Sequence, residues 1–147
     1  MKRLMRMLMV AALALSLPAQ ATDFPRQNYL LYCAGCHLPD GTGSAANEVP
    51  TLHDIPGHFI KVPRGREFLA QVPGILYSPL TDMEAAEILN WMLLQYSQPV
   101  LPADFKPYTA EEVARHRRIK PADIMKVRTE VLAELAAKGI VIDYTAH

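Results

Sequence analysis

The most regular hydrophobic pattern in this chain lies between residues 81 and 97. Apolar side chains recur there every three or four residues, at Ala85, Ile88, Leu89, Met92, Leu93 and Tyr96. This is the period of one face of an α-helix. Thr81 and Glu84 have the spacing of a capping box, and Pro99 disfavours helical geometry at the residue before it. The pattern predicts an amphipathic helix that begins after Thr81 and ends before Ser97.

A second helix is predicted just after the first 22 residues. Asp23-Phe24-Pro25 is typical of a helix start, and the helix is expected to continue to Cys36. Pro39 and the two glycines after it prevent further continuation. Residues 38–63 are then expected to form a long loop, and residues 66–71 a short helix.

Beyond residue 97 the pattern changes. Three prolines between residues 98 and 107 predict an extended linker over the surface. Thr109-Ala110-Glu111-Glu112 is a second capping-box sequence, which opens a short basic helix ending near Arg118. A last helix is expected from Pro121 to Gly139, followed by a short β-like tail at residues 140–144. The apolar stripe of this last helix consists of Ile124, Val127, Val131, Leu132 and Leu135.

The first 21 residues have a different character. Lys2, Arg3 and Arg6 form a basic start, residues 8–17 are apolar apart from one serine, and Ala19-Gln20-Ala21 supplies small residues. This order matches a secretory signal peptide, and its apolar run is too short to span a bilayer comfortably. An uncleaved membrane anchor is the alternative. We therefore expect a periplasmic protein with no transmembrane span after signal cleavage.

The charge balance narrows the range of partners. The full chain of 147 residues has 15 basic and 15 acidic side chains. Three of the basic ones lie in the predicted signal peptide, so that twelve face fifteen acidic ones in the mature chain, a formal net charge of −3. This mild acidity argues against nucleic acid or an anionic membrane surface as a partner. The mature length suits one small domain with an extension.

The strongest chemical signal is Cys33-Ala34-Gly35-Cys36-His37, which contains both cysteines of the chain. C-x-x-C-H is the attachment sequence of a c-type haem. Each thiol adds across one haem vinyl group, and the two intervening residues let both sulfurs reach the same porphyrin edge. His37 can then take the proximal axial position on the iron. The motif predicts one covalently attached haem c.

Other functions of two neighbouring cysteines account for the sequence around them less well than haem attachment does. A thioredoxin-like redox pair follows a β-strand, and no strand pattern precedes Cys33. A zinc site needs about four protein ligands, and no second Cys/His cluster is present. A disulfide between Cys33 and Cys36 leaves His37 unexplained. No acid–base pair, nucleophile triad or phosphate-binding loop is evident, so we expect an electron carrier rather than an enzyme.

These features together resemble a small monohaem class I cytochrome c. The resemblance covers about residues 24–97, with the haem motif followed by Asp40-Gly41-Thr42-Gly43, Pro50-Thr51-Leu52 and a final helix that carries Asn90-Trp91. It implies an all-α fold whose first and last helices cross at the haem edge. It also implies that the Pro50 carbonyl accepts a hydrogen bond from His37, which makes Pro50 a cofactor-binding residue.

The resemblance divides the chain into three parts. These are a signal peptide at residues 1–21, a monohaem cytochrome c domain at residues 22–98, and a proline-rich linker with a C-terminal helical extension at residues 99–147. The last part lies outside the resemblance.

The sixth iron ligand is the open question. The family usually takes it from a methionine in the loop before the final helix, and residues 72–80 contain none. Met83, on the first turn of that helix, is the nearest candidate metal ligand, with an ordinary helix residue as the alternative. Met92 lies in the apolar stripe and is expected to pack in the core. His58, Tyr77 and an empty position stay open.

Two further groups are candidates for contact with the haem propionates. His58 stands where relatives often carry an arginine with that role. Arg64 belongs to a basic cluster close to His58, together with Lys61 and Arg66; a solvated basic loop is the alternative. His53 follows Pro50-Thr51-Leu52 on the proximal side, where a distal role is sterically awkward.

The predicted function is periplasmic transfer of single electrons between redox partners. The partner is expected to be a periplasmic dehydrogenase or oxidase. The residues past Gln98 are candidates for binding this chain to that partner as a subunit. If the sixth position is open or weakly filled, the haem instead binds small ligands. The protein would then be a gas sensor or a peroxidase-like enzyme, with His58 and either Arg64 or Arg66 as its distal pair.

Overall fold

The computed structural model of the protein describes residues 23–142. The predicted signal peptide at residues 1–21 and the end of the predicted tail, past residue 142, lie outside the described residues. Over the described range the chain folds into helices, and its only β-type pairing is an isolated bridge between Ser44 and Val49. The predicted all-α fold class is confirmed.

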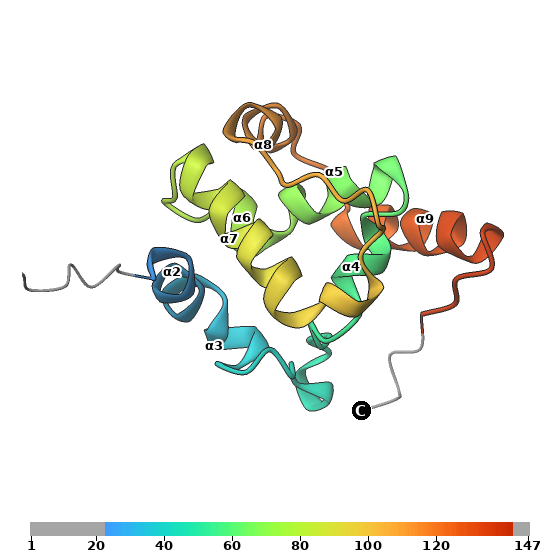
Figure 1. Cartoon of the computed structure of the whole chain (residues 1–147), viewed down its shortest axis with the longest axis horizontal. Helices are drawn as coiled ribbons and strands as arrows, with labels where there is room; N and C mark the ends of the chain where they lie inside the picture. The colour runs from blue at the N-terminus through green and yellow to red at the C-terminus, as the bar shows by residue number, and fades with distance from the viewer. Residues whose placement is uncertain (1–22, 143–147) are drawn as a thin grey trace, which may run out of the picture.

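The helices follow one another closely along the chain (Figure 1). In chain order they are α2 (Phe24–Tyr32), α3 (Ala34–His37), α4 (Pro56–Phe59), α5 (Pro63–Gln71), α6 (Pro73–Leu76), α7 (Asp82–Tyr96), α8 (Ala110–Arg117) and α9 (Ile124–Ala137), with the 3-10 helices η1 (Ala45–Asn47) and η2 (Gln98–Val100). Between residues 23 and 142, none of these helices has the length and apolar character needed to cross a membrane.

Prolines that suggest loops in the sequence in fact start helices. Pro56, Pro63 and Pro73 each occupy the first turn of a helix, namely α4, α5 and α6. Proline is tolerated there because the first N–H groups of a helix have no partner within it. The expectation of an uninterrupted loop over residues 38–63 is therefore wrong, and α5 begins three residues earlier than predicted.

The first predicted helix is present but breaks at Cys33. Asp23 caps α2 by accepting a hydrogen bond from the Arg26 N–H. Cys33 then departs from helical geometry, with φ −121° and ψ −37°, and α3 carries the rest of the motif. Leu38, with a positive φ of 63°, ends α3.

Helix α7 has the predicted bounds and the complete capping box at Thr81 and Glu84. Its stripe is buried at five positions and half-buried at Met92. Helix α2 packs against α7, and the Tyr29 ring lies 5.2 Å from Trp91 and 5.6 Å from Tyr96, centre to centre. The packing of the first helix on the final helix that the resemblance implies is thus present.

The residues past 98 complete the main hydrophobic cluster. Helix α8 packs on α7 and α5, and α9 packs on α5 and α4 (Figure 1). Tyr108, Val113, Val127, Val131 and Leu135 are buried in one cluster with the side chains of α4, α5 and α7. Whether residues 22–98 form a domain of their own stays a prediction, but their apolar core is continuous with the predicted extension.

The last elements differ from the sequence expectation in detail. Helix α9 begins at Ile124, because the Asp123 side chain accepts from the Met125 and Lys126 N–H groups. Gly139, with φ 77°, follows its end. Residues 140–142 form no strand, so within the described part of the chain the expected β-like tail is absent.

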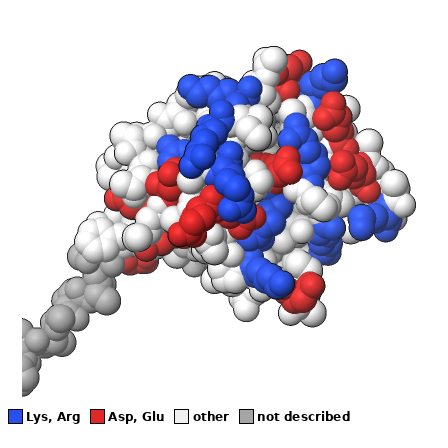
Figure 2. Space-filling view, turned by 90° about the horizontal axis from the view of Figure 1, so that it is seen from above, with Lys and Arg blue, Asp and Glu red and all other residues white. Residues whose placement is uncertain are grey.

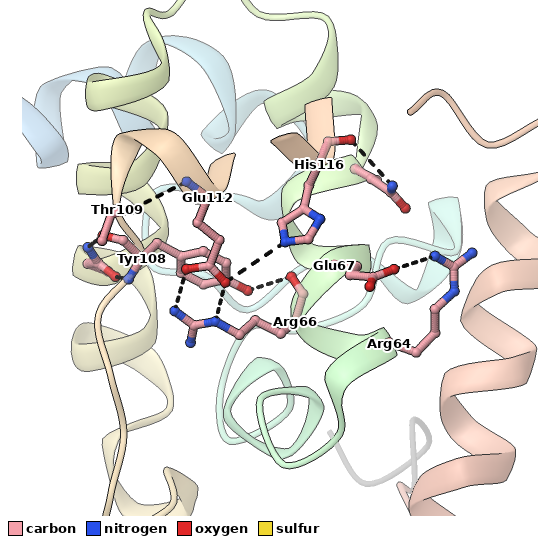
Figure 3. Close-up of polar contacts among 9 residues, drawn as sticks. Arg64, Arg66, Glu67, Tyr108, Thr109, Glu112 and His116 are labelled. Carbon is pink, nitrogen blue, oxygen red and sulfur yellow. Dashed lines mark hydrogen bonds and ion pairs between the residues drawn. The ribbon is translucent and has the colours of Figure 1, made fainter. Parts of the chain in front are cut away.

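A polar network joins the linker before α8 to α5 and α7 (Figure 3). Asn90 pairs with both the N–H and the carbonyl of Tyr108, and the Tyr108 hydroxyl donates to the Arg66 carbonyl at 2.7 Å. Arg66 forms a two-pronged ion pair with Glu112, with Nη2 2.8 Å from Oε2. Thr109 accepts from the Glu112 N–H, but the Glu112 carboxylate binds Arg66 instead of closing the predicted capping box.

This ion pair shifts the titration of Glu112. Burial alone would raise the pKa of its carboxyl, but the hydrogen bonds and charge of Arg66, with His116 and Arg115, bring the pKa below its ordinary 4.5. A lowered folded-state pKa contributes stability that is present above pH 4.5 and is lost as the pH falls through the folded value.

Glu112→Gln should therefore lower the free energy of unfolding at neutral pH by about 1.5–3 kcal/mol, the range for hydrogen bonds to charged groups. The deficit relative to wild type should shrink as the pH falls below 4.5, because wild type then loses the same carboxylate. Urea unfolding between pH 3 and 7 measures both. Glu87→Gln, which changes an exposed carboxylate on α7, is the control; a deficit for Glu112→Gln independent of pH would contradict the assignment.

Candidate functional site

Both cysteines of the haem motif carry free thiols in the structure. Cys36 is exposed, whereas Cys33 is half-buried and contacts two hydrophobic clusters. One is the main cluster of α4, α5 and α7 to α9; the other consists of Tyr29, Ala34, Leu52 and Tyr96. Burial, with a smaller contribution from Cys36, raises the pKa of the Cys33 thiol to about 11. Catalytic C-x-x-C thiols have a lowered pKa, the opposite direction to the shift of the Cys33 pKa.

The imidazole of His37 is oriented by a backbone carbonyl. Its Nδ1 lies 3.0 Å from the Pro50 oxygen, and because a carbonyl only accepts hydrogen bonds, Nδ1 carries the proton. The lone pair of the neutral ring is therefore on Nε2. Burial lowers the pKa of His37, against the opposing effect of the Pro50 bond. Metal-binding histidines in proteins are commonly held through their other ring nitrogen in this way.

The loop after His37 is folded back to bring the Pro50 carbonyl into place. The Gly43 N–H donates to the His37 carbonyl at 3.0 Å, and the Leu52 N–H donates to the Gly41 carbonyl at 2.8 Å. Gly43 has φ 72°, and a Cβ there would lie 2.6 Å from the Pro50 carbonyl carbon and oxygen. The loop thus needs glycine at position 43, for both its backbone angle and the space that Pro50 occupies.

Three ring side chains hold three consecutive carbonyls after the motif. The Tyr29 hydroxyl donates to Leu38 at 2.7 Å and the Tyr96 hydroxyl to Pro39 at 3.2 Å. Nε2 of His53 donates to Asp40 at 2.8 Å, and the His53 ring packs on Tyr96 with centres 5.2 Å apart. Helical spacing places Tyr96 in the apolar stripe of α7, but no sequence signal shows that the hydroxyls of Tyr29 and Tyr96 hold this loop.

The other candidates have partners of their own. Lys61 Nζ lies 3.2 Å from His58 Nδ1, and because an ammonium only donates, Nδ1 accepts. Burial, reinforced by the Lys61 charge, lowers the pKa of His58. Arg64 pairs with Glu67 at 2.8 Å (Figure 3), and Arg66 pairs with Glu112. The structure thus brings Cys33, Cys36, His37 and Pro50 together. His58 instead contacts Lys61, between α4 and α5, and Arg64 contacts Glu67 on α5.

The two candidate methionines differ in burial. Met83 on the first turn of α7 is 62% exposed, whereas Met92 packs against both hydrophobic clusters. The core position expected for Met92 is thus present, and the thioether of Met83 is uncommitted to the core. Tyr77, in the segment before α7, is 67% exposed.

The residues present fit a haem. Two free thiols and an imidazole with an available Nε2 are the donors that covalent attachment and axial ligation require. Apolar side chains on both sides of the motif are exposed, namely Leu31, Tyr32 and Leu38. A Cβ at Gly74 would lie 3.8 Å from the Tyr32 carbonyl, so α6 lies beside the start of the motif. An apolar macrocycle is the kind of group that such side chains cover.

Acidic and basic side chains are interspersed on the face that carries α8, as Figure 2 shows, rather than gathered into a patch of one sign. Within residues 23–142, no group of three or more His, Cys, Asp or Glu side chains is arranged to hold a metal ion by itself.

Comparison with known proteins points to c-type cytochromes. No protein-family model matches the chain. It is 28% identical, over an alignment of 152 positions, to a cytochrome c-552 of Thermus thermophilus, with 89% of this chain and 98% of that protein covered. A second cytochrome c-552 of Thermus thermophilus is 28% identical over 119 residues, covering 67% of this chain and 90% of that protein.

The first alignment also reaches past the predicted domain boundary. Residues 1–98 make up about two thirds of the chain, so an alignment that covers 89% of it must include residues beyond 98. The similarity is thus wider than residues 24–97, to which the sequence analysis confined it.

Gly43→Ala should displace the Pro50 carbonyl and release His37. We expect a loss in the free energy of unfolding of roughly 1–2 kcal/mol from the left-handed backbone and about 1–3 kcal/mol from the overlap. The imidazole Nδ1–H signal of His37 in NMR spectra should shift or disappear.

Gly35→Ala is the matched control, because a Cβ at position 35 meets nothing within 4 Å. Equal stability and an unchanged His37 signal in Gly43→Ala would contradict the packing argument.

Proposed function

We propose that this chain is a monohaem c-type cytochrome that carries single electrons between redox partners. The observation that carries the proposal is the geometry of Cys33, Cys36 and His37, in which both thiols are free and Nδ1 of the imidazole is bound to the Pro50 carbonyl. The similarity to two proteins named cytochrome c-552 supports the same conclusion independently.

Each residue of the site has a defined task in this proposal. Cys33 and Cys36 hold the haem through thioether bonds, and His37 offers Nε2 as the proximal ligand. The iron of a bound haem c cycles between the ferrous and ferric states by one electron. The chain contributes the orientation of the His37 ring, through Pro50, and a packed apolar surround that limits access of water.

Met83 is our proposal for the sixth ligand. Its support is that the thioether is exposed and lies at the N-terminal end of α7, next to the segment that borders the motif. His58 and Tyr77 are the alternative ligands, and His58 and Arg64 are proposed to contact the propionates. An open sixth site, with binding of small molecules, is the second candidate function; it is favoured by the lack of methionine in residues 72–80.

The cellular location and the redox partner are also proposals. The signal-peptide pattern of residues 1–21 supports export to the periplasm, where covalent attachment retains the cofactor. The partner would be a dehydrogenase or oxidase of the same compartment.

Covalent haem is the first test. The full chain, produced in a host that matures c-type cytochromes, should give the pyridine haemochrome spectrum of a haem c, and the haem should stay with the protein in acidified acetone. The Cys33→Ala, Cys36→Ala double variant should lose it, because no thioether can form. His53→Ala, which removes an imidazole outside the motif, should retain it. A colourless wild-type protein would refute the proposal.

The ferric absorption spectrum tests the sixth ligand. If Met83 ligates, wild type should show the far-red band typical of methionine-ligated ferric haem, and Met83→Ala should abolish it. Met125→Ala is a close control, because Met125 also lies on the first turn of a helix and is 59% exposed.

A band lost in His58→Ala instead would reassign the ligand. A high-spin wild-type spectrum that shifts on addition of cyanide would favour the open site.

A further inference from the structure

The segment that joins α5 to α7, residues 72–80, is contacted at its two ends by the end of α8 and the residues after it. The contacts come from residues 116–120, which belong to the predicted extension. They fall at Gln71, just before the segment, and at residues 77–82, so the extension touches the part of the chain that leads to Met83.

Arg117 provides the strongest of these contacts. Its Nη1 donates to the Leu80 carbonyl and to Oδ1 of Asp82, both at 2.9 Å, and its Nη2 donates to the Ser78 carbonyl at 3.1 Å. The Arg117 side chain is only 15% exposed. One guanidinium therefore binds three acceptors over five residues of backbone, a geometry that its planar fork allows and a lysine ammonium does not reproduce.

Two weaker contacts act at the other positions. Just before the segment, Gln71 is 1% exposed, and its Nε2 donates to the His116 and Ile119 carbonyls at 3.4 and 3.2 Å. Next to Ser78, the Lys120 ammonium lies 5.7 Å from the centre of the Tyr77 ring. Both ends of the segment are thus fixed to the same short stretch of the extension.

Residues 72–80 lie next to the haem motif on one side and next to the proposed sixth ligand, Met83, on the other. Helix α6, within the segment, lies beside the Tyr32 carbonyl that precedes Cys33. Asp82, which binds Arg117, is the first residue of α7 and the neighbour of Met83. Movement of the segment would therefore move the start of α7 and the Met83 side chain with it.

We propose that Arg117 is a positioning residue, which fixes residues 78–82 and thereby restrains the distal side of the proposed haem, so that outside ligands reach the iron slowly. This inference rests on the proposed function. It assigns the residues past 98 a role within the haem site, in addition to their part in the core.

The test compares Arg117→Gln with wild type as full-length, haem-loaded proteins. Loss of the charge-assisted hydrogen bonds should raise the hydrogen-exchange rates of the backbone amides of residues 75–78 and 80–82 by about tenfold or more, from the usual strength of such bonds. The rate at which imidazole binds the ferric haem should rise about tenfold as well, since the same opening admits it.

Arg118→Gln is the matched control, because Arg118 is the exposed next residue; it should leave both rates unchanged. Arg117→Lys keeps the charge but not the planar fork, and should give intermediate rates. Amides of α9 at residues 131–135 should exchange as in wild type if the effect is local. If Arg117→Gln does not fold, Asp82→Asn, which weakens one of the three contacts, is compared in its place.

The outcomes separate the two proposals. Equal imidazole-binding rates in haem-loaded wild type and Arg117→Gln would overturn this inference alone, whether or not exchange changes. Faster exchange throughout the chain would overturn it too, because it would show a structural role only. A wild-type protein without covalent haem would overturn the proposed function, and this inference with it.

Discussion

The hydrogen bond from His37 Nδ1 to the Pro50 carbonyl is the interaction on which the site depends. It fixes the ring orientation and leaves Nε2 available, and it exists only because the loop after the motif returns to α3. That return depends on the positive φ of Gly43 and on the hydroxyls of Tyr29 on α2 and Tyr96 on α7. Two helices far apart in sequence therefore cooperate with a glycine-rich loop to orient one imidazole.

The second constraint is that the apolar core is incomplete without the residues past 98. Helices α8 and α9 contribute buried valines and Leu135 to the same cluster as α4, α5 and α7. Their removal would expose that cluster to water, at a cost of about 25 cal/mol for each Å² of apolar surface. A truncated chain would therefore report on folding before it reported on any partner, which makes single substitutions the better way to study this part of the protein.

Much of the fold follows from local sequence signals, and the rest from contacts distant in sequence. The period of the α7 stripe and the Thr81–Glu84 capping box give that helix its bounds, because both act within a few residues. The same reasoning predicts a capping box at Thr109, and it fails there because Arg66, 46 residues earlier, binds the Glu112 carboxylate. Prolines at helix starts and in loops look alike in sequence, so the pattern does not predict α4 and α6. The donor set of the site is readable in five consecutive residues, whereas the links from Arg117 to residues 78–82 depend on tertiary packing that no local pattern encodes.

The unequal exposure of the two thiols has a consequence for biogenesis. Cys36 is open to solvent, but Cys33 lies half-buried where two hydrophobic clusters meet, and its thiol is protonated at neutral pH. A ligation machinery that must reach both sulfurs has easier access to a chain that has not yet closed around the first of them. Haem attachment would then have to precede the folding of the chain around Cys33, and a chain that folds first would be attached more slowly.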